Sequence, residues 1–144
     1  PGQGIASHVD THSAFGGTLL SLSLGSGVVM EFRRAPRAGT AGADDGGGGD
    51  GAIERIWLPA RSLLVLEGEA RYAWQHGIPC RHTDRVDDTI VPRGTRVSLT
   101  LREAMPPGAR CRCAFPEYCD RPAAADVACA TEECASSPAN GALR

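Results

Sequence analysis

Short runs of strand-forming residues, separated by turn signals, restrict the possible folds of this chain more than any other feature. The expected strands cover residues 4–10, 18–24, 28–33, 55–58, 62–67, 73–78 and 96–102. Gly25-Ser26-Gly27 predicts a hairpin turn between the second and third runs, and Pro59-Ala60-Arg61 predicts a second turn. No stretch has a long 3.6-residue apolar period. We therefore predict an all-β fold, either a sandwich or a barrel.

Size and charge exclude some classes of protein. The chain has 144 residues, which is enough for one domain with its own core. Its formal net charge is −2, so it has no bulk attraction to nucleic acid. Any RNA or DNA must then meet a local patch or parts outside this chain. No apolar run approaches the roughly 20 residues needed to cross a bilayer, so we expect no membrane partner.

Two segments differ from the rest in composition. Residues 35–52 are rich in glycine and contain three aspartates, which predicts a flexible loop inserted between two strands rather than an acidic metal site. Residues 121–144 are rich in alanine, serine and proline, which predicts a disordered tail. The folded domain is therefore expected over residues 1–120. The chain begins with Pro1 rather than Met, and we interpret it as a fragment whose upstream domains and targeting signal stay open.

The run HVDTH at residues 8–12 places three metal-binding side chains at alternate positions. Alternate residues of a strand share a face, so His8 and Asp10 can converge on one ion. Two histidines and one carboxylate make the facial triad of non-haem Fe(II) oxygenases. The third ligand must come from a distant strand. His76, between aromatic residues and a glycine, suits a strand end that faces a cavity, although alone it would be a core histidine.

The run 96–102 alternates strictly between polar and apolar side chains. Its pleat puts Val97, Leu99 and Leu101 on one face and Arg96, Ser98, Thr100 and Arg102 on the other. In isolation this pattern is typical of a half-exposed edge strand. If the polar face points inward, its two guanidinium groups would hold a small dicarboxylate through charge-assisted bonds. The dicarboxylate that Fe(II) dioxygenases use is 2-oxoglutarate.

The cysteines favour metal binding over disulfides. Cys111, Cys113 and Cys119 are clustered, and two cysteines at positions i and i+2 form a better metal chelate than a disulfide. We therefore expect a reducing compartment, the cytoplasm or the nucleus. No partner is predicted for the remaining cysteines, which are Cys80, Cys129 and Cys134.

Together, His8-x-Asp10, His76 and Arg96-x5-Arg102 resemble the AlkB family of Fe(II)/2-oxoglutarate dioxygenases. That family folds as a double-stranded β-helix, a jelly roll of the cupin-like type. The resemblance implies that His8, Asp10 and His76 are the catalytic iron ligands. It also implies that Arg96 pairs with the distal carboxylate of 2-oxoglutarate and that Arg102 lies near its iron-chelating end. Further segments, at residues 1–5, 8–15, 21–26, 30–32 and 68–78, are most similar to the tRNA-modifying branch of the family.

That branch also implies a structural zinc site. Its members bind zinc through the second histidine of the HxDxH run and a C-x-C-x5-C group after the last strand. The corresponding residues in this chain are His12, Cys111, Cys113 and Cys119. One imidazole and three thiolates make a closed tetrahedral set, which is usual for structural zinc.

The activity implied by this branch is hydroxylation of 5-methoxycarbonylmethyluridine at the wobble position of tRNA. An anticodon-loop base is already unpaired and enters a pocket at little cost. The implied partners are the tRNA anticodon loop, 2-oxoglutarate and O2, with a tRNA methyltransferase as a separate protein or a fused domain. We expect the isolated chain, which lacks the upstream parts of the family domain, to be weakly active or inactive.

Three other functions compete with this prediction. Oxidative demethylation of alkylated nucleic-acid bases would use the same iron and cofactor residues, and the zinc cluster favours the tRNA branch over it. Protein hydroxylation would need no RNA. An inactive, zinc-stabilised binding module is disfavoured because all the predicted iron and 2-oxoglutarate residues are present.

Overall fold

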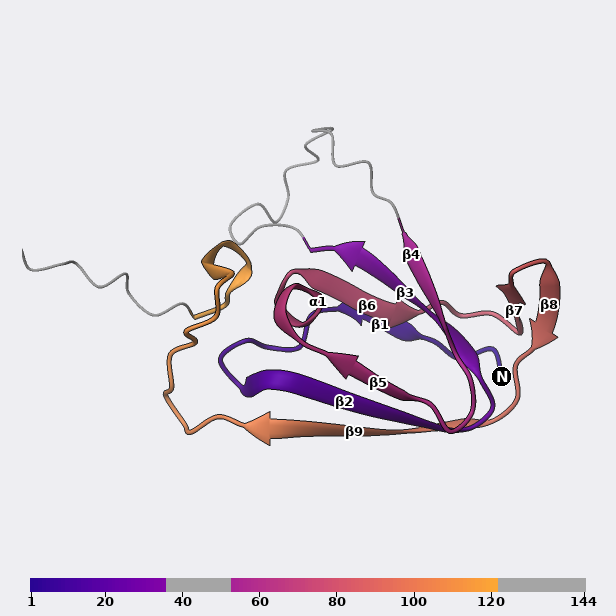
Figure 1. Cartoon of the computed structure of the whole chain (residues 1–144), viewed down its shortest axis with the longest axis horizontal. Coiled ribbons are helices and arrows are strands. Elements are labelled where there is room, and N and C mark those ends of the chain that lie inside the picture. The colour runs from indigo at the N-terminus through magenta and orange to yellow at the C-terminus, as the bar shows by residue number, and fades with distance from the viewer. Residues whose placement is uncertain (36–52, 122–144) are drawn as a thin grey trace, which may run out of the picture.

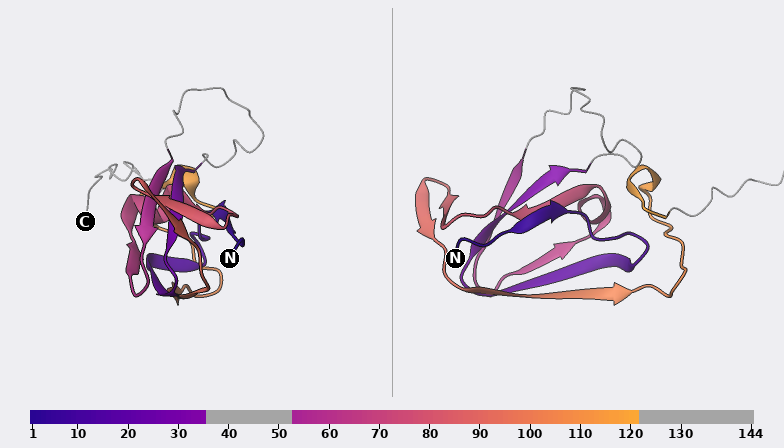
Figure 2. Two further views of the ribbon diagram at one scale, coloured as in Figure 1. Left: turned by 90° about the vertical axis from the view of Figure 1, so that its right-hand side faces the viewer. Right: turned by 180° about the vertical axis from the view of Figure 1, so that it is seen from behind.

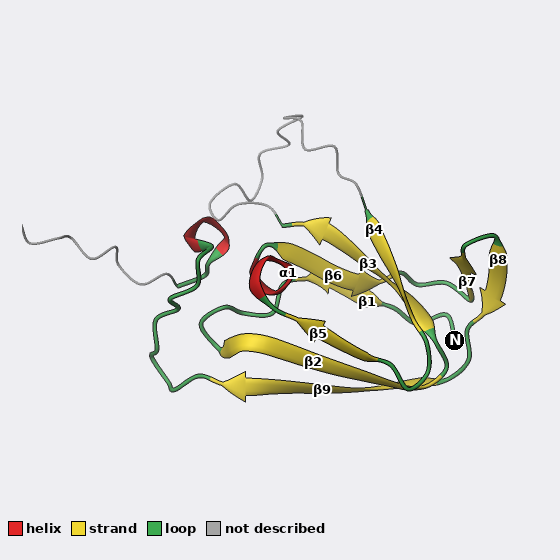
Figure 3. Cartoon of the chain, in the orientation of Figure 1, coloured by secondary structure: helices red, strands yellow, loops and turns green. Residues whose placement is uncertain are grey.

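The computed structural model describes residues 1–35 and 53–121, and their dominant feature is two facing β-sheets (Figures 1 and 3). The strands are β1 (Ile5–His8), β2 (Phe15–Gly25), β3 (Val28–Arg34), β4 (Glu54–Leu58), β5 (Leu63–Leu66), β6 (Trp74–Ile78), β7 (Thr83–Val86), β8 (Thr89–Pro92) and β9 (Arg96–Ala104). A single helical turn, α1 (Gly68–Tyr72), precedes β6, and a 3-10 turn spans Pro116–Tyr118. The all-β prediction is confirmed.

Both sheets are antiparallel, and their strand orders interleave along the chain. One sheet has the order β1-β6-β3-β4 and the other has the order β5-β2-β9. Apart from the β3–β4 hairpin, consecutive strands of the two sheets alternate between the layers, which is the winding of a double-stranded β-helix. The β7–β8 ribbon projects from one end, and the segment after β9 runs along the opposite end (Figures 1 and 2).

The predicted hairpin at Gly25-Ser26-Gly27 is wrong, because β2 and β3 do not pair with each other. Instead β2 pairs with β5 and β9, whereas β3 pairs with β4 and β6. The backbone N–H of Ser26 donates to Thr95 O at 2.9 Å, which ties this corner to the start of β9. The turn after β4 is a second corner of the same kind. Apolar side chains explain why β2 and β3 lie in different sheets. Each of these two strands buries its apolar inward face against the opposite layer, so the chain must cross between layers at this turn.

The core lies between the layers. Its buried members come from both sheets and are Leu19, Val28, Met30, Phe32, Leu58, Leu66 and Ile78. Alternation along β3 directs Met30 and Phe32 inward, as expected for a strand with one face on the core. Hydrophobic burial between the layers therefore fixes the frame that carries the site.

Strand β9 has the reverse polarity. Arg96 and Arg102 line a cavity between the sheets, whereas Val97, Leu99 and Leu101 are about half exposed on the outer face, at 51%, 50% and 56%. The inward orientation of the polar face, on which the dicarboxylate prediction depended, is therefore present.

Some predictions fall outside the described residues. They are the flexible loop at 35–52, apart from Ala35, and the tail at 121–144, apart from Arg121. Within the described ranges, no helix is long and apolar enough to cross a membrane.

Candidate active site and a second metal-binding cluster

His8, Asp10 and His76 come together at one point between the sheets. Their potential ligand atoms all lie within 4.8 Å of one another. His8 ends β1 and is the register partner of His76 in β6, so the pairing of these strands brings the two imidazoles to a centroid distance of 4.6 Å. Asp10 lies two residues beyond the end of β1 rather than within a continuous strand, as the alternation argument assumed.

Each imidazole is prepared to act as a neutral ligand. The carbonyl oxygen of Ala6 lies 2.8 Å from His8 Nδ1 and can only accept a hydrogen bond. In the neutral tautomer that fits this contact, Nδ1 carries the proton and Nε2 offers its lone pair to a metal. Burial, and then the neighbouring His8, lower the pKa of His76 to about 4. His76 is therefore uncharged near neutral pH, which is the state that binds a metal.

Arg102 holds the carboxylate of Asp10. Its Nη2 lies 3.1 Å from Asp10 Oδ1, while Asp10 Oδ2 lies 3.9 Å from His76 Nε2. The Arg102 guanidinium also lies over the ring of Phe15, at 5.2 Å from its centroid. One carboxylate oxygen is thus engaged by the arginine, and the other lies nearer to His76.

A cavity of about 210 Å³ opens from this point into the space between the sheets. Its polar wall is formed by β9, and its apolar walls are formed by core residues of both layers. The side chains that line it include Met30, Leu64, Leu66, Ile78, Arg96, Ser98, Thr100 and Arg102, together with His8, Asp10 and His76. The predicted iron residues and the predicted 2-oxoglutarate residues therefore share one cavity.

Arg96 provides a cation in this cavity without an acidic partner among the described residues. Its Nη2 donates to the buried Ser23 Oγ at 2.8 Å and more weakly to Ser98 Oγ at 3.3 Å. Burial lowers the pKa of Arg96, and no described acidic group opposes the shift. A guanidinium that is held only by neutral hydroxyl groups is suited to an anionic ligand.

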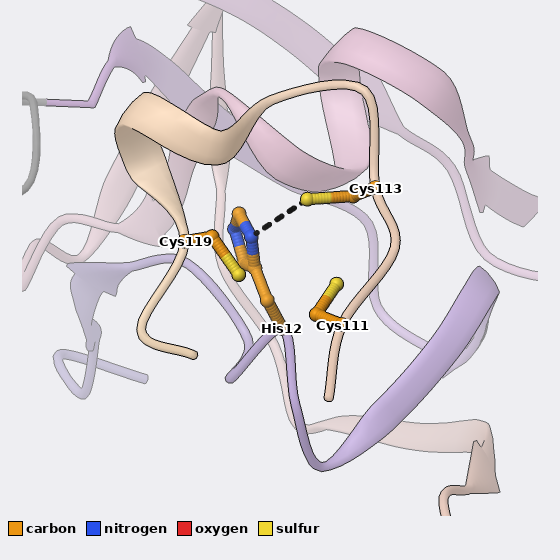
Figure 4. A group of neighbouring side chains, drawn as sticks. All are labelled: His12, Cys111, Cys113 and Cys119. Atoms are coloured by element: carbon orange, nitrogen blue, oxygen red, sulfur yellow. Dashed lines mark hydrogen bonds between the residues drawn. The ribbon is translucent and has the colours of Figure 1, made fainter. Parts of the chain in front are cut away.

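A second cluster forms at the opposite end of the HxDxH run. The ligand atoms of His12, Cys111, Cys113 and Cys119 also lie within 4.8 Å of one another. Figure 4 shows the three thiols and the imidazole directed toward a common point, with the cysteines carried by the segment that follows β9. His12 Nδ1 lies 3.5 Å from Cys113 Sγ. The structure therefore brings all four predicted residues together.

The chemistry of this cluster suits a cation. The carbonyl of Tyr72 accepts from His12 Nε2 at 2.9 Å, which leaves Nδ1 as the lone pair that faces the thiols. Burial, followed by the charge of Arg71, lowers the pKa of His12 and keeps it neutral. Burial also raises the pKa of Cys113, and raises that of Cys119 to about 12. A bound cation would supply the positive charge that these thiolates need.

Three buried polar residues, two beside the site and one in β7, were not predicted from the sequence. Arg71 is 1% exposed and contacts the loop that carries Asp10, and Ser23 is 0% exposed and supports Arg96. Asp84 is also buried and accepts two bonds from Arg93. A buried arginine, serine or aspartate has no local sequence signal, because its burial depends on strands that are distant in the chain.

Comparison with known proteins assigns the family. A model described as the 2OG-Fe(II) oxygenase superfamily matches residues 1–102. This chain therefore belongs to the 2OG-Fe(II) oxygenase superfamily, which implies Fe(II) and 2-oxoglutarate as cofactors. The resemblance to AlkB proteins is confirmed, because relatives that match most of the chain are named ALKBH8 or ALKBH8 homolog.

Two groups of relatives are informative. The chain is 44% identical over 124 residues to an Arabidopsis thaliana protein named alkylated DNA repair protein ALKBH8 homolog. The matched region covers 83% of this chain and 35% of that protein. It is 40% identical over 136 residues to tRNA (carboxymethyluridine(34)-5-O)-methyltransferase ALKBH8 of Macaca fascicularis, covering 83% of this chain and 18% of that protein. It is 30% identical over 100 residues to a Caenorhabditis elegans DNA N6-methyl adenine demethylase, covering 69% and 27%. The chain thus spans about a third or less of these relatives.

Proposed function

We propose that this chain is the oxygenase domain of an enzyme that hydroxylates a modified wobble uridine, 5-methoxycarbonylmethyluridine, in tRNA. The observation that carries the proposal is the shared cavity. In it, the potential ligand atoms of His8, Asp10 and His76 lie within 4.8 Å of one another, and Arg96 forms part of the polar wall. The two cofactors of the family need a three-ligand metal site and an anion site in the same cavity.

In this proposal His8, Asp10 and His76 hold Fe(II). When bound, Fe(II) with 2-oxoglutarate supplies the activation of O2 that hydroxylation requires. The chain contributes positioning: Ala6 fixes the tautomer of His8, and burial keeps His76 neutral. Arg102 orients the carboxylate of Asp10. These contacts let the ligands meet the metal with little reorganisation.

Arg96 is the proposed partner of the distal carboxylate of 2-oxoglutarate. Its guanidinium can offer two parallel N–H donors, a geometry that matches a carboxylate. Arg102 is at the Asp10 end of the cavity, where it would lie near the metal-chelating end of 2-oxoglutarate. Apolar side chains on the other walls, such as Met30 and Leu64, exclude water and strengthen these charge interactions.

His12, Cys111, Cys113 and Cys119 are proposed to hold zinc. The donor set has one imidazole nitrogen and three sulfur atoms and is substantially buried, as in structural zinc sites. Such an ion would fasten the segment after β9 to the loop that leads from β1 into β2. Its role is therefore structural, close to the catalytic residues but separate from the chemistry.

Wobble uridine is favoured as substrate by the relatives. The macaque and Xenopus tropicalis proteins are named for methylation of carboxymethyluridine at position 34 of tRNA, at 40% and 39% identity. Because the net charge of this chain is −2, RNA binding is assigned to other parts of the complete protein. A methyltransferase acting on the same nucleotide is the proposed partner or fused domain.

A second candidate is oxidative demethylation of alkylated bases. It is favoured by the Arabidopsis name, which refers to alkylated DNA repair, and by the demethylase name of the worm relative. The same iron and 2-oxoglutarate residues would serve both reactions, so the cavity does not distinguish them.

The test is product analysis with the complete protein that contains this chain. It is incubated with Fe(II), 2-oxoglutarate and either tRNA carrying 5-methoxycarbonylmethyluridine or oligonucleotides with methylated bases, and nucleosides are then separated by mass spectrometry. We expect the hydroxylated wobble nucleoside, with none formed by a His8→Ala control. Demethylated bases together with unchanged tRNA would favour the second candidate, and no succinate with either substrate would refute both.

A further inference from the structure

Arg71 is the most deeply placed cation near either metal cluster, and neither cluster includes it as a ligand. It lies in α1, is 1% exposed, and its guanidinium contacts the loop between β1 and β2. All of its hydrogen bonds to this loop and to the first two residues of β2 go to backbone carbonyls. They join Nη1 to Asp10 O at 2.7 Å, Nη2 to Thr11 O at 3.2 Å and to Phe15 O at 3.3 Å, and Nε to Gly16 O at 3.2 Å.

The same loop carries a member of each cluster. Asp10 belongs to the iron cluster and His12 to the cysteine cluster, two residues apart. The residue after Arg71 completes the contact, because the carbonyl of Tyr72 accepts from His12 Nε2. One helical turn thus holds the main chain at Asp10 through a guanidinium and the side chain of His12 through a carbonyl.

Two other contacts support the loop, because the Asp120 carboxylate accepts from Ser13 and Met105 N donates to Ala14 O at 2.9 Å. Neither contact engages a carbonyl that Arg71 binds. Within the loop, the described backbone bond to one of those carbonyls is from Ala14 N to Thr11 O, at a long 3.4 Å. Buried carbonyls need donors, and a planar guanidinium can satisfy several at once in a fixed arrangement. A lysine ammonium is a compact point charge and cannot reach the same set of acceptors.

We propose that Arg71 is a positioning residue that sets the Asp10–Gly16 segment, which is the end of the loop and the start of β2, and thereby couples occupancy of the cysteine cluster to metal affinity at His8, Asp10 and His76. This inference rests on the proposed function, since it takes both clusters to bind metals. An ion at the cysteine cluster fixes His12, and the loop held by Arg71 transmits that order to Asp10. Coupling between two binding sites is reciprocal, so each metal strengthens binding of the other.

The first test measures Mn(II) binding to the zinc-loaded chain from the loss of the free Mn(II) resonance signal. Mn(II) serves as a redox-stable probe of the iron site, and a His8→Ala variant defines the signal that belongs to that site. We expect Arg71→Lys to weaken Mn(II) binding by roughly 10- to 100-fold, the usual cost of losing a residue that orients metal ligands.

A matched control is Arg93→Lys. Arg93 is another buried arginine, 8% exposed, but it binds Asp84 of β7 and not the metal-bearing loop. We expect Arg93→Lys to lower the melting temperature without weakening Mn(II) binding. Unchanged Mn(II) affinity in Arg71→Lys, or an equal loss in Arg93→Lys, would overturn the inference.

A second measurement does not depend on any Arg71 variant folding. Mn(II) affinity of the unaltered chain is compared before and after zinc is removed from the cysteine cluster, with folding followed by circular dichroism. We expect removal of zinc to weaken Mn(II) binding, and equal affinities would overturn the coupling. If the unaltered zinc-loaded chain binds no Mn(II) through His8, the proposed function itself is refuted. If that chain binds Mn(II) and Arg71→Lys binds it equally well, only the role of Arg71 is refuted.

Discussion

Replacing Arg96 with methionine should weaken 2-oxoglutarate binding strongly while leaving the fold intact. Methionine keeps an unbranched apolar stem, although a shorter one, and has no charge. In the free protein the guanidinium bonds only to neutral hydroxyls, those of Ser23 and Ser98, so its loss breaks no ion pair among the described residues. Removing a half-buried cation that has no acidic partner should leave the melting temperature of the ligand-free protein equal or slightly higher.

The expected magnitude follows from the pairing that 2-oxoglutarate would make. Truncating one member of a buried, hydrogen-bonded charge pair costs about 2–5 kcal/mol, or roughly 30-fold to several-thousand-fold in affinity. Arg96 is only partly buried in the free protein, so we expect a value in the lower half of this range. The affinity for pyruvate, which has the 2-oxo acid group but no distal carboxylate, should be almost unchanged in Arg96→Met.

The assay is calorimetric titration of the Mn(II)-loaded chain with each 2-oxo acid. Arg96→Lys should retain part of the affinity for 2-oxoglutarate, because it keeps the charge but loses the two-donor geometry. Arg33→Met is the matched control, since Arg33 is a half-exposed strand residue that pairs with Glu31 away from the cavity. The reasoning is refuted if Arg96→Met binds 2-oxoglutarate normally, or if it loses pyruvate by the same factor.

The remaining predictions concern the metal residues and the buried carboxylate. His8→Ala should abolish 2-oxoglutarate turnover by the complete protein while zinc content stays unchanged, whereas His12→Ala should lose zinc and lower the melting temperature before turnover fails; loss of zinc from His8→Ala would contradict this. Asp84→Asn should destabilise the chain by about 3–5 kcal/mol, because it leaves the buried Arg93 guanidinium without its partner, and an unchanged denaturant midpoint would count against it. Burial alone would raise the pKa of Asp84, but the Arg93, Val29 and Arg81 hydrogen bonds lower it below 3.8. The ionised Asp84 carboxylate therefore stabilises the fold fully above about pH 3.8, and this stabilisation is lost as the pH falls through the lower pKa that Asp84 has in the folded chain. The exposed control Asp88→Asn should leave this pH dependence unchanged.

Local patterns predicted the strands better than they predicted their partners. The alternation of residues 96–102 fixed both the strand and its two faces, and β9 has those faces in the structure. The Gly25-Ser26-Gly27 turn was assigned to the wrong class, because a tight turn is needed both in a hairpin and at a corner between layers. Only the pairing of β2 with β5 and β9 distinguishes the two, and that pairing is between segments distant in the sequence.

The site shows the same division. His8, Asp10 and the cysteines follow short spacings that are visible in the sequence, and the structure brings each proposed set together. Arg71 has no such spacing, since its acceptors are carbonyls about 60 residues away, for which residue type is irrelevant. The five-residue turn α1 that positions it was also absent from the predicted elements, because one helical turn is too short to show a 3.6-residue period.

The most direct test of the account is metal and cofactor stoichiometry of the chain after anaerobic reconstitution. Iron and zinc are counted by elemental analysis, and 2-oxoglutarate binding is measured on the same sample. The account predicts one Fe(II) and one zinc per chain, with 2-oxoglutarate bound only when iron is present. Zinc at both clusters, with no binding of 2-oxoglutarate under any metal loading, would contradict it and identify a zinc-stabilised module without oxygenase chemistry.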